Sequence, residues 1–542
     1  MTLLSGDRPT GRIYGTRSPV LARNGLIATS HPLASSAGLH VLLEGGNAID
    51  AAVTAAATLG VVEPTMTGVG GDLFAQVFDA RTRTLKGLNS SGRAGGAANA
   101  AALRKSGVTA VPTHGPLSIT VPGSVAGWAA LLEAFGTIPL ARALAPAIRY
   151  AREGFPVSEV VAAQWSAVAP RLALDPESAR VLLPAGREPR SGEVFRNPDL
   201  AITLEHIAQS GPSAMYGGPL GGTIASHISA LGGLLTAPDF AGHRSDWVTP
   251  IHTTYRGYTL FELPPNTQGF VALEMLNLLE GYDVAALGHN SAGHLHVYTE
   301  AKRIAFADRA AHLGDPGHVP PELLAVLTSK SYAAERRRDI DQRRAAERYE
   351  AAVAAGTSEA RGDTVYLAAA DRFGNVISLI NSLYDSFGSG IVVPGTGVAL
   401  HSRGSGFTLA DGHPNCLAPG KRPMHTLVPA FLIRDDATVM AFGVMGADNQ
   451  AQAHAQIVMN IADFGMNIQE AGDVARVRHF EDGLAVESGI PAGVRDELRA
   501  RGHQVHDGRG MMGGYQAVCL DVATGVLHGG SDHRKDGMAV GW

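Results

Sequence analysis

Hydrophobic positions in the first part of the chain recur at helical spacing. Over residues 31–64 the apolar residues follow a helical period that is interrupted at Gly45-Gly46. This pattern predicts two packed helices, the second of which begins near Asn47. The same period returns over 124–136 and 140–155, so these two segments are also predicted to be helices.

Other segments switch to short apolar runs bounded by turn residues, which is typical of strands. Residues 72–79 and 84–92 are predicted to pair with each other, and further strands are predicted within 247–262. A helix is expected over 268–281, after a Pro-Pro pair. The charged segment 331–350 is expected to form a solvated helix with few core residues.

The pattern changes most abruptly at Thr364. Residues 351–363 are small and polar, which is the composition of a flexible loop. From Thr364 the sequence alternates with period two over 364–371, turns at 372–375 and continues as a second apolar run over 376–384. A β-hairpin whose first strand starts with threonine is therefore predicted.

Composition narrows the classes of function. The 542 residues are 45% hydrophobic and include 66 glycines, which favours one large or two moderate globular units with many tight turns. The formal net charge is −6 and basic residues are dispersed, so neither nucleic acid nor an anionic membrane surface is an expected partner. A small molecule is the better expectation.

Cysteine usage and hydropathy address redox state and localisation. Cys416 and Cys519 are the only cysteines; they could pair, but two reduced thiols are expected, and a thiolate metal cage is excluded. The N-terminus shows no basic segment followed by an apolar run, and no stretch of 18 apolar residues occurs. These observations predict a soluble cytoplasmic protein.

Familiar catalytic motifs are mostly absent. There is no G-x-S-x-G elbow, Walker loop or H-E-x-x-H pair, and the glycines of 68–74 lack the third glycine and the acidic partner of a dinucleotide site. Metal-ligating side chains do gather in one stretch, which contains His289, His294, His296 and Glu300. His296 and Glu300 are one helical turn apart, as a metal site would require. An amphipathic helix capped by Asn290 or Ser291 would account for the same residues without a metal. We favour this helix and expect no metal.

Thr364 acquires a chemical role if the peptide bond after Asp363 is cut. The threonine would then carry a free α-amine beside its own hydroxyl, and an α-amino group has a reference pKa of about 7.7 to 8.0. Nucleophile and base would belong to one residue. The strand would fix the hydroxyl, whereas the preceding loop would be free to leave. The alternative is an ordinary strand threonine.

Longer sequence motifs help to decide whether Thr364 is a nucleophile or an ordinary strand threonine. They include "GGNAIDAAVTAAATLGVVEPTMTGVGGD", "VPGSVAGW", "LPPNTQGFVALEMLNLLEGYD", "EAKRIAFADR", "GDTVYLAAADRFGNVIS", "PGKRPMHTLVPA" and "GGSDHRKDGMA". In this order, and over nearly the whole chain, they resemble the γ-glutamyltransferase family of N-terminal-nucleophile hydrolases. The resemblance implies an α+β fold of the four-layer αββα type and a proenzyme that cleaves itself between Asp363 and Thr364. A large segment, 1–363, and a small segment, 364–542, would stay together as one globular unit, with no cofactor.

The resemblance also implies catalytic roles. Thr364 matches the nucleophile, and Ser382 matches a second hydroxyl residue, usually threonine, that hydrogen-bonds to it. The stretch "FGVMGADNQ" matches the loop whose backbone N–H groups bind the oxyanion, so Gly446 and Ala447 are the expected donors. Two such donors stabilise a tetrahedral intermediate by a few kcal/mol. Ala447 replaces a second glycine but keeps its N–H.

The substrate side departs from the family pattern. Family members that act on γ-glutamyl groups hold the α-amino and α-carboxylate groups with an Asn, a Gln and an Asp, and the corresponding positions here are Tyr384, Arg403 and Gly406. The acidic partner for a substrate ammonium is therefore missing, whereas Arg403 offers a bidentate fork for a carboxylate. A pocket for an acid without a neighbouring amine is predicted, although Arg403 could instead be a surface loop arginine.

Three further residues are carried over with less definite roles. His425 and Thr426 stand where the family has two serines that contact the substrate carboxylate. His425 would either donate a hydrogen bond to the same anion or fill space. Arg93 is displaced along the sequence from the family's upstream carboxylate-binding arginine.

The substrate-side pattern is similar to the branch of the family that contains oxamate amidohydrolase, through "GSGIVVPGTGVAL", "HPNCLAPGKRP" and "GGYQAV". The predicted function is hydrolysis of an amide of a small carboxylate-bearing acyl group, of the oxamate type, through an acyl-enzyme on Thr364. The alternatives are a glutaryl-type cephalosporin acylase, a glutathione hydrolase or γ-glutamyltransferase, and an uncleaved binding protein. Transfer to an acceptor, and association of two αβ units, stay open.

Overall fold

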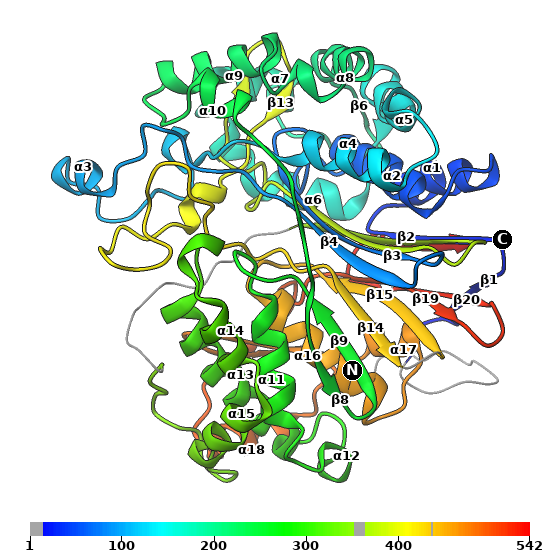
Figure 1. Ribbon diagram of the computed structural model, residues 1–542, viewed down its shortest axis with the longest axis vertical. Coiled ribbons are helices and arrows are strands. Elements are labelled where there is room, and N and C mark those ends of the chain that lie inside the picture. The colour runs from blue at the N-terminus through cyan, green and yellow to red at the C-terminus, as the bar shows by residue number, and fades with distance from the viewer. Residues whose placement is uncertain (1–14, 352–363, 435–436) are drawn as a thin grey trace.

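The computed structural model describes residues 15–351, 364–434 and 437–542. Two seven-stranded antiparallel sheets lie face to face, and helices cover the outer face of each sheet (Figure 1). The layers follow one another as helix, sheet, sheet, helix. The predicted α+β class and the αββα sandwich are therefore confirmed.

The first sheet has the threonine hairpin at its centre. Its strand order is β21-β2-β10-β11-β3-β4-β7, and every neighbouring pair is antiparallel. The strands are β21 (Met538–Gly541), β2 (Gly25–Thr29), β10 (Val365–Asp371), β11 (Val376–Ser382), β3 (Asp72–Asp79), β4 (Thr84–Ser90) and β7 (Asp246–Val248). The β10–β11 hairpin thus lies between strands that precede residue 364 in the chain.

The second sheet mixes early and late parts of the chain in the same way. Its order is β1-β20-β19-β15-β14-β9-β8, again antiparallel throughout. The strands are β1 (Val20–Ala22), β20 (Leu527–Ser531), β19 (Tyr515–Asp521), β15 (Thr438–Val444), β14 (Ala430–Arg434), β9 (Tyr258–Glu262) and β8 (Ile251–Tyr255). Strands from both sides of residue 364 therefore share each sheet.

Helices form the two outer layers (Figure 1). One layer contains α1 (Pro32–Leu43), α2 (Ala48–Val62), α4 (Ser124–Phe135), α5 (Leu140–Glu153), α6 (Glu159–Leu172), α7 (Pro176–Leu182), α8 (Pro198–Ser210) and α9 (Pro219–Ala230). The other contains α11 (Gly269–Leu279), α13 (Ala292–His312), α14 (Pro321–Leu327), α15 (Lys330–Arg336), α16 (Asn449–Ala462), α17 (Ile468–Asp473) and α18 (Ala492–Ala500). The predicted helices at 31–64, 124–136, 140–155 and 268–281, and the predicted strands, are confirmed.

Short elements complete the described chain. The short helices are α3 (Ala100–Lys105), α10 (Ala237–Ala241) and α12 (Val284–Leu287). Small sheets are formed by β5 (Phe155–Pro156) with β6 (Val194–Phe195), by β12 (Val392–Val393) with β13 (Val398–Ala399), and by β16 (Val477–Phe480), β17 (Gly483–Val486) and β18 (Val505–Asp507).

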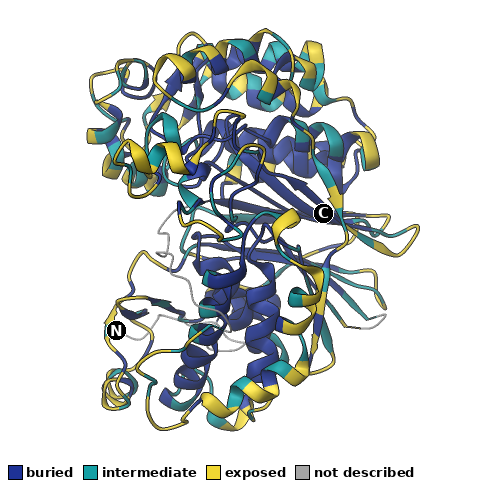
Figure 2. Ribbon diagram, turned by 60° about the vertical axis from the view of Figure 1, so that its left-hand side comes forward, coloured by how far each residue is buried: buried dark blue, intermediate teal, exposed yellow. Residues whose placement is uncertain are grey.

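Apolar clusters fill the three spaces between the four layers. One packs α1, α2, α4 and α5 against the first sheet, the second lies between the sheets, and the third joins the second sheet to α11, α13 and α16. Figure 2 shows most residues of the sheets, and of the helices that pack against them, in dark blue as buried. Strand β10 serves two clusters in alternation, with Val365, Leu367 and Ala369 in the first and Tyr366, Ala368 and Ala370 in the second. A slip of one residue would exchange these faces, so the register that places Thr364 is firmly fixed.

The helix predicted over 331–350 is wrong beyond its first turns. α15 ends at Arg336, and after a short 3-10 turn the rest of the segment is irregular up to residue 351. Arg303 and Glu300 on α13 explain the difference. Arg303 donates to the carbonyl of Ala346 at 2.7 Å, and Glu300 accepts from the N–H of Ala346 at 2.9 Å. A continuing helix would have to pair these backbone groups internally.

The two ends of the described chain lie against β2 and β20. Trp542 accepts a backbone hydrogen bond from Asn24 at 2.9 Å and donates to Gly25 at 3.2 Å, beside β2. Near the other end, Arg17 donates to the carbonyl of Ser531 on β20 at 2.9 Å. Cys416 and Cys519 are free, as expected. Among the described helices, none is both long and apolar enough to cross a membrane.

Candidate active site

The first sheet brings Thr364 and Ser382 together. Thr364 directly precedes β10 and Ser382 ends β11, and the pairing of Val365 with Asn381 aligns the two strand ends. The hydroxyl oxygens are 3.1 Å apart, and both residues are buried. Ser382 Oγ also accepts from the backbone N–H of Tyr384 at 2.8 Å, which orients its hydroxyl. Asp363, the other side of the predicted cleavage site, lies outside the described residues.

A left-handed turn between β15 and α16 presents the predicted oxyanion donors. Gly446 has φ +112° and Ala447 has φ +51°, and α16 begins directly after this turn. Among the described residues, no group accepts a hydrogen bond from the N–H of Gly446 or Ala447. The positive end of the α16 dipole adds to two available donors, which is the electrostatic requirement for binding a developing oxyanion.

A buried network that the sequence did not reveal supports this turn. Gln268, just before α11, donates to the carbonyl of Thr426 at 3.0 Å and to that of Ala447 at 3.1 Å. Arg309 on α13 donates to Gln268 Oε1 at 2.7 Å and also to Asp448, at the N-terminus of α16. Gln268 and Arg309 fall within the motifs that carry the family resemblance. Their residue types and local sequence did not indicate that they support this turn.

Ala447→Gly is expected to raise the unfolding free energy by about 1 kcal/mol, because an L-residue is strained in the left-handed region and glycine is not. The N–H survives, so kcat is expected to stay within about twofold. Thermal unfolding and turnover of any accepted amide check this result. A large fall in kcat without a change in stability would show that the methyl group itself contacts the reacting atoms.

Arg403 is a buried arginine with unused donors, not a surface loop residue. Its side chain is 0% exposed, Nη1 donates to Thr426 Oγ1 at 3.1 Å, and the guanidinium lies 4.0 Å from the centre of the Tyr384 ring. Nε and Nη2 have no hydrogen-bond partner among the described residues. Burial lowers the pKa of Arg403 to about 10, so the group stays charged at neutral pH.

The aromatic ring of Tyr384 packs against the Arg403 guanidinium. It adopts φ +80°, an uncommon conformation for a bulky residue, directly after the nucleophile hairpin. Burial raises the pKa of Tyr384 to about 12, so the phenol is neutral at physiological pH. Tyr384, Arg403 and Thr426 therefore form one contiguous group next to Ser382.

His425 makes its polar contacts with the protein. Its Nε2 donates to Asp72 Oδ2 at 3.1 Å, and its Nδ1 accepts from the N–H of Leu427 at 3.3 Å. Burial lowers the pKa of His425 to about 3, so the ring is neutral. Both nitrogens are thus engaged without a substrate anion, and no sequence pattern indicated Asp72 as the partner.

The hydrogen bonds of Arg93 do not connect it with Arg403, Tyr384 or Thr426. It donates to Asp246 Oδ2 at 3.0 Å and to the carbonyl of Arg244 at 3.4 Å. Arg93 and Arg422 line a cavity of about 470 Å³, and Arg403 is not part of its lining.

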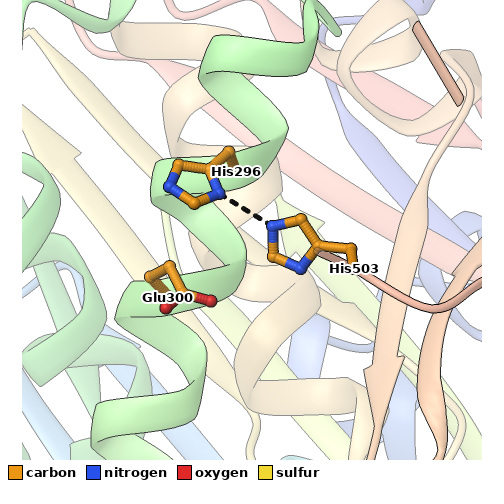
Figure 3. Close-up of side chains that lie close together, drawn as sticks. All are labelled: His296, Glu300 and His503. Atoms are coloured by element: carbon orange, nitrogen blue, oxygen red, sulfur yellow. Dashed lines mark hydrogen bonds between the residues drawn. The ribbon is translucent and has the colours of Figure 1, made fainter. Parts of the chain in front are cut away.

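Figure 3 shows another cluster that contains two of the residues considered as metal ligands. His296 and Glu300 on α13 point toward His503, and one ligand atom from each lies within 4.8 Å of the others. Protein partners already occupy these atoms. His296 Nδ1 pairs with His503 Nε2 at 2.8 Å, its Nε2 donates to a backbone carbonyl at 2.7 Å, and Glu300 pairs with Arg303 at 2.9 Å. These contacts are satisfied without an ion.

The other polar residues of segment 289–294 have structural roles. Ser291 is the N-cap of α13 and accepts from the N–H of His294 at 3.1 Å, whereas Asn290 donates to the carbonyl of Ala475 at 2.8 Å. His289 and His294 both pack against the ring of Phe464. The prediction of a capped helix is confirmed, with Ser291 as the cap.

A cavity of about 380 Å³ adjoins the turn at Gly446, the predicted oxyanion site. Its lining includes Gly446, Arg478, Met511, Met512, Arg534 and Lys535. Cationic side chains outnumber acidic ones in this lining, in which Glu487 is the only acid and is paired with Arg534. A polar or anionic group could therefore lie next to the oxyanion turn at modest electrostatic cost.

Comparison with known proteins settles the family. The profile of the gamma-glutamyltranspeptidase family matches residues 34–542. The chain belongs to this family. The resemblance predicted from the motifs is therefore confirmed, and the chain is an enzyme of the N-terminal-nucleophile hydrolase type.

Individual family members match over almost their full lengths. The glutathione hydrolase-like YwrD proenzyme of Bacillus subtilis is 38% identical over 533 residues, covering 96% of this chain and 99% of that protein. The oxamate amidohydrolase proenzyme of Klebsiella pneumoniae is 34% identical over 541 residues, with coverages of 96% and 99%. The crystal structure of cephalosporin acylase from Bacillus halodurans is 40% identical, with a TM-score of 0.91 and 98% of each chain covered.

Proposed function

We propose that the chain cleaves itself before Thr364 and then hydrolyses an amide whose acyl group carries a carboxylate. Two of the relatives above are named proenzymes, which supports processing into a large segment, 1–363, and a small segment, 364–542. The hydroxyl pair of Thr364 and Ser382 supports the choice of nucleophile. The available N–H groups of the turn before α16 support the choice of oxyanion site.

The proposed reaction uses Thr364 as both nucleophile and base. Its α-amine removes the proton of its own hydroxyl, which attacks the carbonyl carbon while the N–H groups of Gly446 and Ala447 bind the oxyanion. Collapse breaks the C–N bond, the protonated amine gives its proton to the leaving nitrogen, and an ester remains on Thr364 Oγ1. A water molecule, deprotonated by the same amine, then attacks the ester, releases the acid and restores Thr364.

The carboxylate preference rests on one observation, the unused donors of buried Arg403. An arginine without an anionic partner is costly to bury, and a carboxylate accepts two parallel hydrogen bonds from its fork. The neighbouring acids are engaged elsewhere, since Asp448 pairs with Arg309 and Asp72 contacts His401 and His425. A substrate carboxylate would complete this pocket.

Position 406, where the family has an acid for the substrate ammonium, is a glycine. Gly406 has no side chain, and a Cβ placed there would lie 3.2 Å from the carbonyl of Met424. That distance is tight, so an acidic residue at 406 would require local rearrangement. An acyl group with a carboxylate and no α-amine therefore fits better than a γ-glutamyl group.

The leaving group distinguishes two candidate substrate types. Oxamate releases ammonia, which needs little space, whereas acylases release larger amines. The cavity of about 380 Å³ beside Gly446 favours a larger leaving group. The glutaryl-type acylase is therefore retained as a second candidate beside the oxamate-type amidohydrolase.

A matched substrate panel tests the proposal. Glutaryl-p-nitroanilide and oxamate are expected to be hydrolysed with a higher kcat/KM than γ-glutamyl-p-nitroanilide and valeryl-p-nitroanilide, measured as p-nitroaniline or ammonia release. Valeryl has the same chain as glutaryl without the carboxylate, and γ-glutamyl adds the α-amine. A higher kcat/KM for γ-glutamyl than for glutaryl would overturn the proposed pocket and favour a glutathione hydrolase.

A further inference from the structure

Asp72 contacts both loops that carry the candidate acyl-binding residues, through His401 and His425. It is the first residue of β3 and lies opposite Ser382 in the pairing of β3 with β11. Its carboxylate is completely buried. Oδ1 accepts from the N–H of Gly92 at 3.0 Å, and Oδ2 lies 3.3 Å from His401 Nδ1 and 3.1 Å from His425 Nε2.

Glycines before Asp72 allow this close approach. A Cβ at Gly71 would lie 2.6 Å from the carbonyl of Ser382, and a Cβ at Gly70 would lie 2.1 Å from that of Ala399. Larger residues at either position would push β3 away from the nucleophile hairpin or from the segment that leads to His401. The sequence "GGD" therefore delivers a carboxylate to the space between the hairpin and the pocket loops.

Each histidine stands next to a pocket residue in sequence. His401 precedes Arg403 by two positions, and His425 directly precedes Thr426. The hydrogen bond from Arg403 Nη1 to Thr426 Oγ1 joins the two loops on the substrate side. Asp72 joins them on the opposite side, through the two imidazoles. One carboxylate thus fixes both loops relative to the strand that carries Ser382.

Both ring nitrogens of His401 lie close to acceptor groups. Its Nε2 lies 2.8 Å from the carbonyl of Thr120, which can only accept, so this nitrogen carries a proton. Its Nδ1 lies 3.3 Å from Asp72 Oδ2, in contact with the carboxylate but without a hydrogen bond of good geometry. His401 therefore lies between the carbonyl of Thr120 and the carboxylate of Asp72.

The contacts of Asp72 with His401 and His425 affect the charge that a substrate would meet. Burial alone would raise the pKa of Asp72, but His401 and His425 outweigh it and hold that pKa well below its usual value. Asp448 is paired with Arg309, and Asp72 is in contact with the two histidines, so the charge of Arg403 is left for the substrate. No described acid hydrogen-bonds to Arg403 in its place.

We infer that Asp72 is a positioning residue that holds the carboxylate-binding loops, through His401 and His425, in register with the Thr364 nucleophile. Asp72 touches neither the reacting atoms nor the substrate in this arrangement. The kinetic part of the inference rests on the proposed function, because it assumes that Arg403 receives an acyl carboxylate. The structural part, that one carboxylate tethers two loops, stands without it.

Asp72→Asn is the test, with Asp371→Asn as the matched control. Asp371 is a buried carboxylate at the far end of β10, where it accepts from the N–H groups of Ala48 and Phe373. We expect Asp72→Asn to cleave itself and to fold. Its kcat/KM for glutaryl-p-nitroanilide is expected to fall about 100-fold, the effect of breaking one buried charged contact. Turnover of valeryl-p-nitroanilide is expected to change less than about threefold.

Hydrogen exchange measured by mass spectrometry supplies a readout that needs no substrate. Faster exchange is expected in Asp72→Asn for peptides covering 399–408 and 422–428, and unchanged exchange for 364–382. The control is expected to lose stability without changing the ratio of the two anilide rates or the exchange of the pocket peptides.

The outcomes separate the inference from the proposed function. Equal losses for both anilides, or unchanged exchange in both loops, would overturn the positioning role of Asp72. If the wild type does not prefer the acidic anilide but the two loops loosen in Asp72→Asn, the proposed function fails and the tether stands. If Asp72→Asn does not fold, His401→Asn replaces it, because that variant keeps the carboxylate and removes one tether; exchange should then rise in 399–408 alone.

Discussion

The Thr364→Ala variant is expected to persist as one chain of 542 residues, whereas the wild type separates into two fragments that break before Thr364. The variant lacks the hydroxyl that lies 3.1 Å from Ser382 Oγ at the start of the central hairpin. Without it, no ester can form at the scissile bond, and self-cleavage is expected to slow by about 10³-fold or more. Intact mass of the purified proteins measures this directly.

Two further variants sharpen the cleavage experiment. Thr364→Ser keeps a hydroxyl and is expected to cleave, at a lower rate. Ser382→Ala keeps the nucleophile but loses its partner, and about a tenfold slower cleavage is expected from the loss of one hydrogen bond to the reacting group. A single full-length mass for the wild type after prolonged incubation would contradict the proposal, and an uncleaved binding protein would then be the better hypothesis.

Arg403→Ala is expected to lower kcat/KM for glutaryl-p-nitroanilide by about 100- to 1000-fold, because the substrate carboxylate loses a buried charged partner. Turnover of valeryl-p-nitroanilide should stay nearly constant, since this substrate presents no carboxylate. Arg403→Lys keeps the charge but not the fork, so an intermediate loss of about tenfold is expected. Kinetics on the two anilides measure each value.

Stability provides an independent check on the same residue. Arg403 is completely buried and leaves two of its donors unpaired among the described residues. Arg403→Met fills similar space without the desolvated charge, so its Tm is expected to equal or exceed that of the wild type. A residue kept for binding would show this combination of unchanged stability and lost activity. A large fall in Tm, with equal losses on both anilides, would mark Arg403 as a structural residue.

Elements with strong local patterns could be predicted from the sequence. The break at Gly45-Gly46 and the cap at Asn47 define α1 and α2 because both signals act within a few residues. The hairpin from Thr364 followed from period-two alternation, and the structure shows why: its two faces serve different apolar clusters. The segment 331–350 failed because contacts from α13, not its own charges, decide its conformation.

Much of the candidate site depends on contacts between distant positions. Asp72 and His425 are 353 residues apart, and Gln268 and Ala447 are 179 apart. No local pattern marks such pairs, so the supporting network around the oxyanion turn was missed. The hydroxyl pair of Thr364 and Ser382 was accessible because one hairpin brings it together. The family resemblance supplied the remaining assignments.

The ends of the chain suggest a way to make the enzyme without maturation. Trp542 is hydrogen-bonded beside β2 and Arg17 contacts the opposite end of β20, so a linker long enough to run along β1 could join the C-terminus to the start of the described chain. A circular permutant that starts at Thr364 would carry the threonine amine from synthesis, once the initiator methionine is removed. It would fill both sheets with the same strands in the same places. Such a gene would uncouple hydrolysis from self-cleavage, so that substitutions that slow maturation, such as Ser382→Ala, could be studied for their effect on turnover alone.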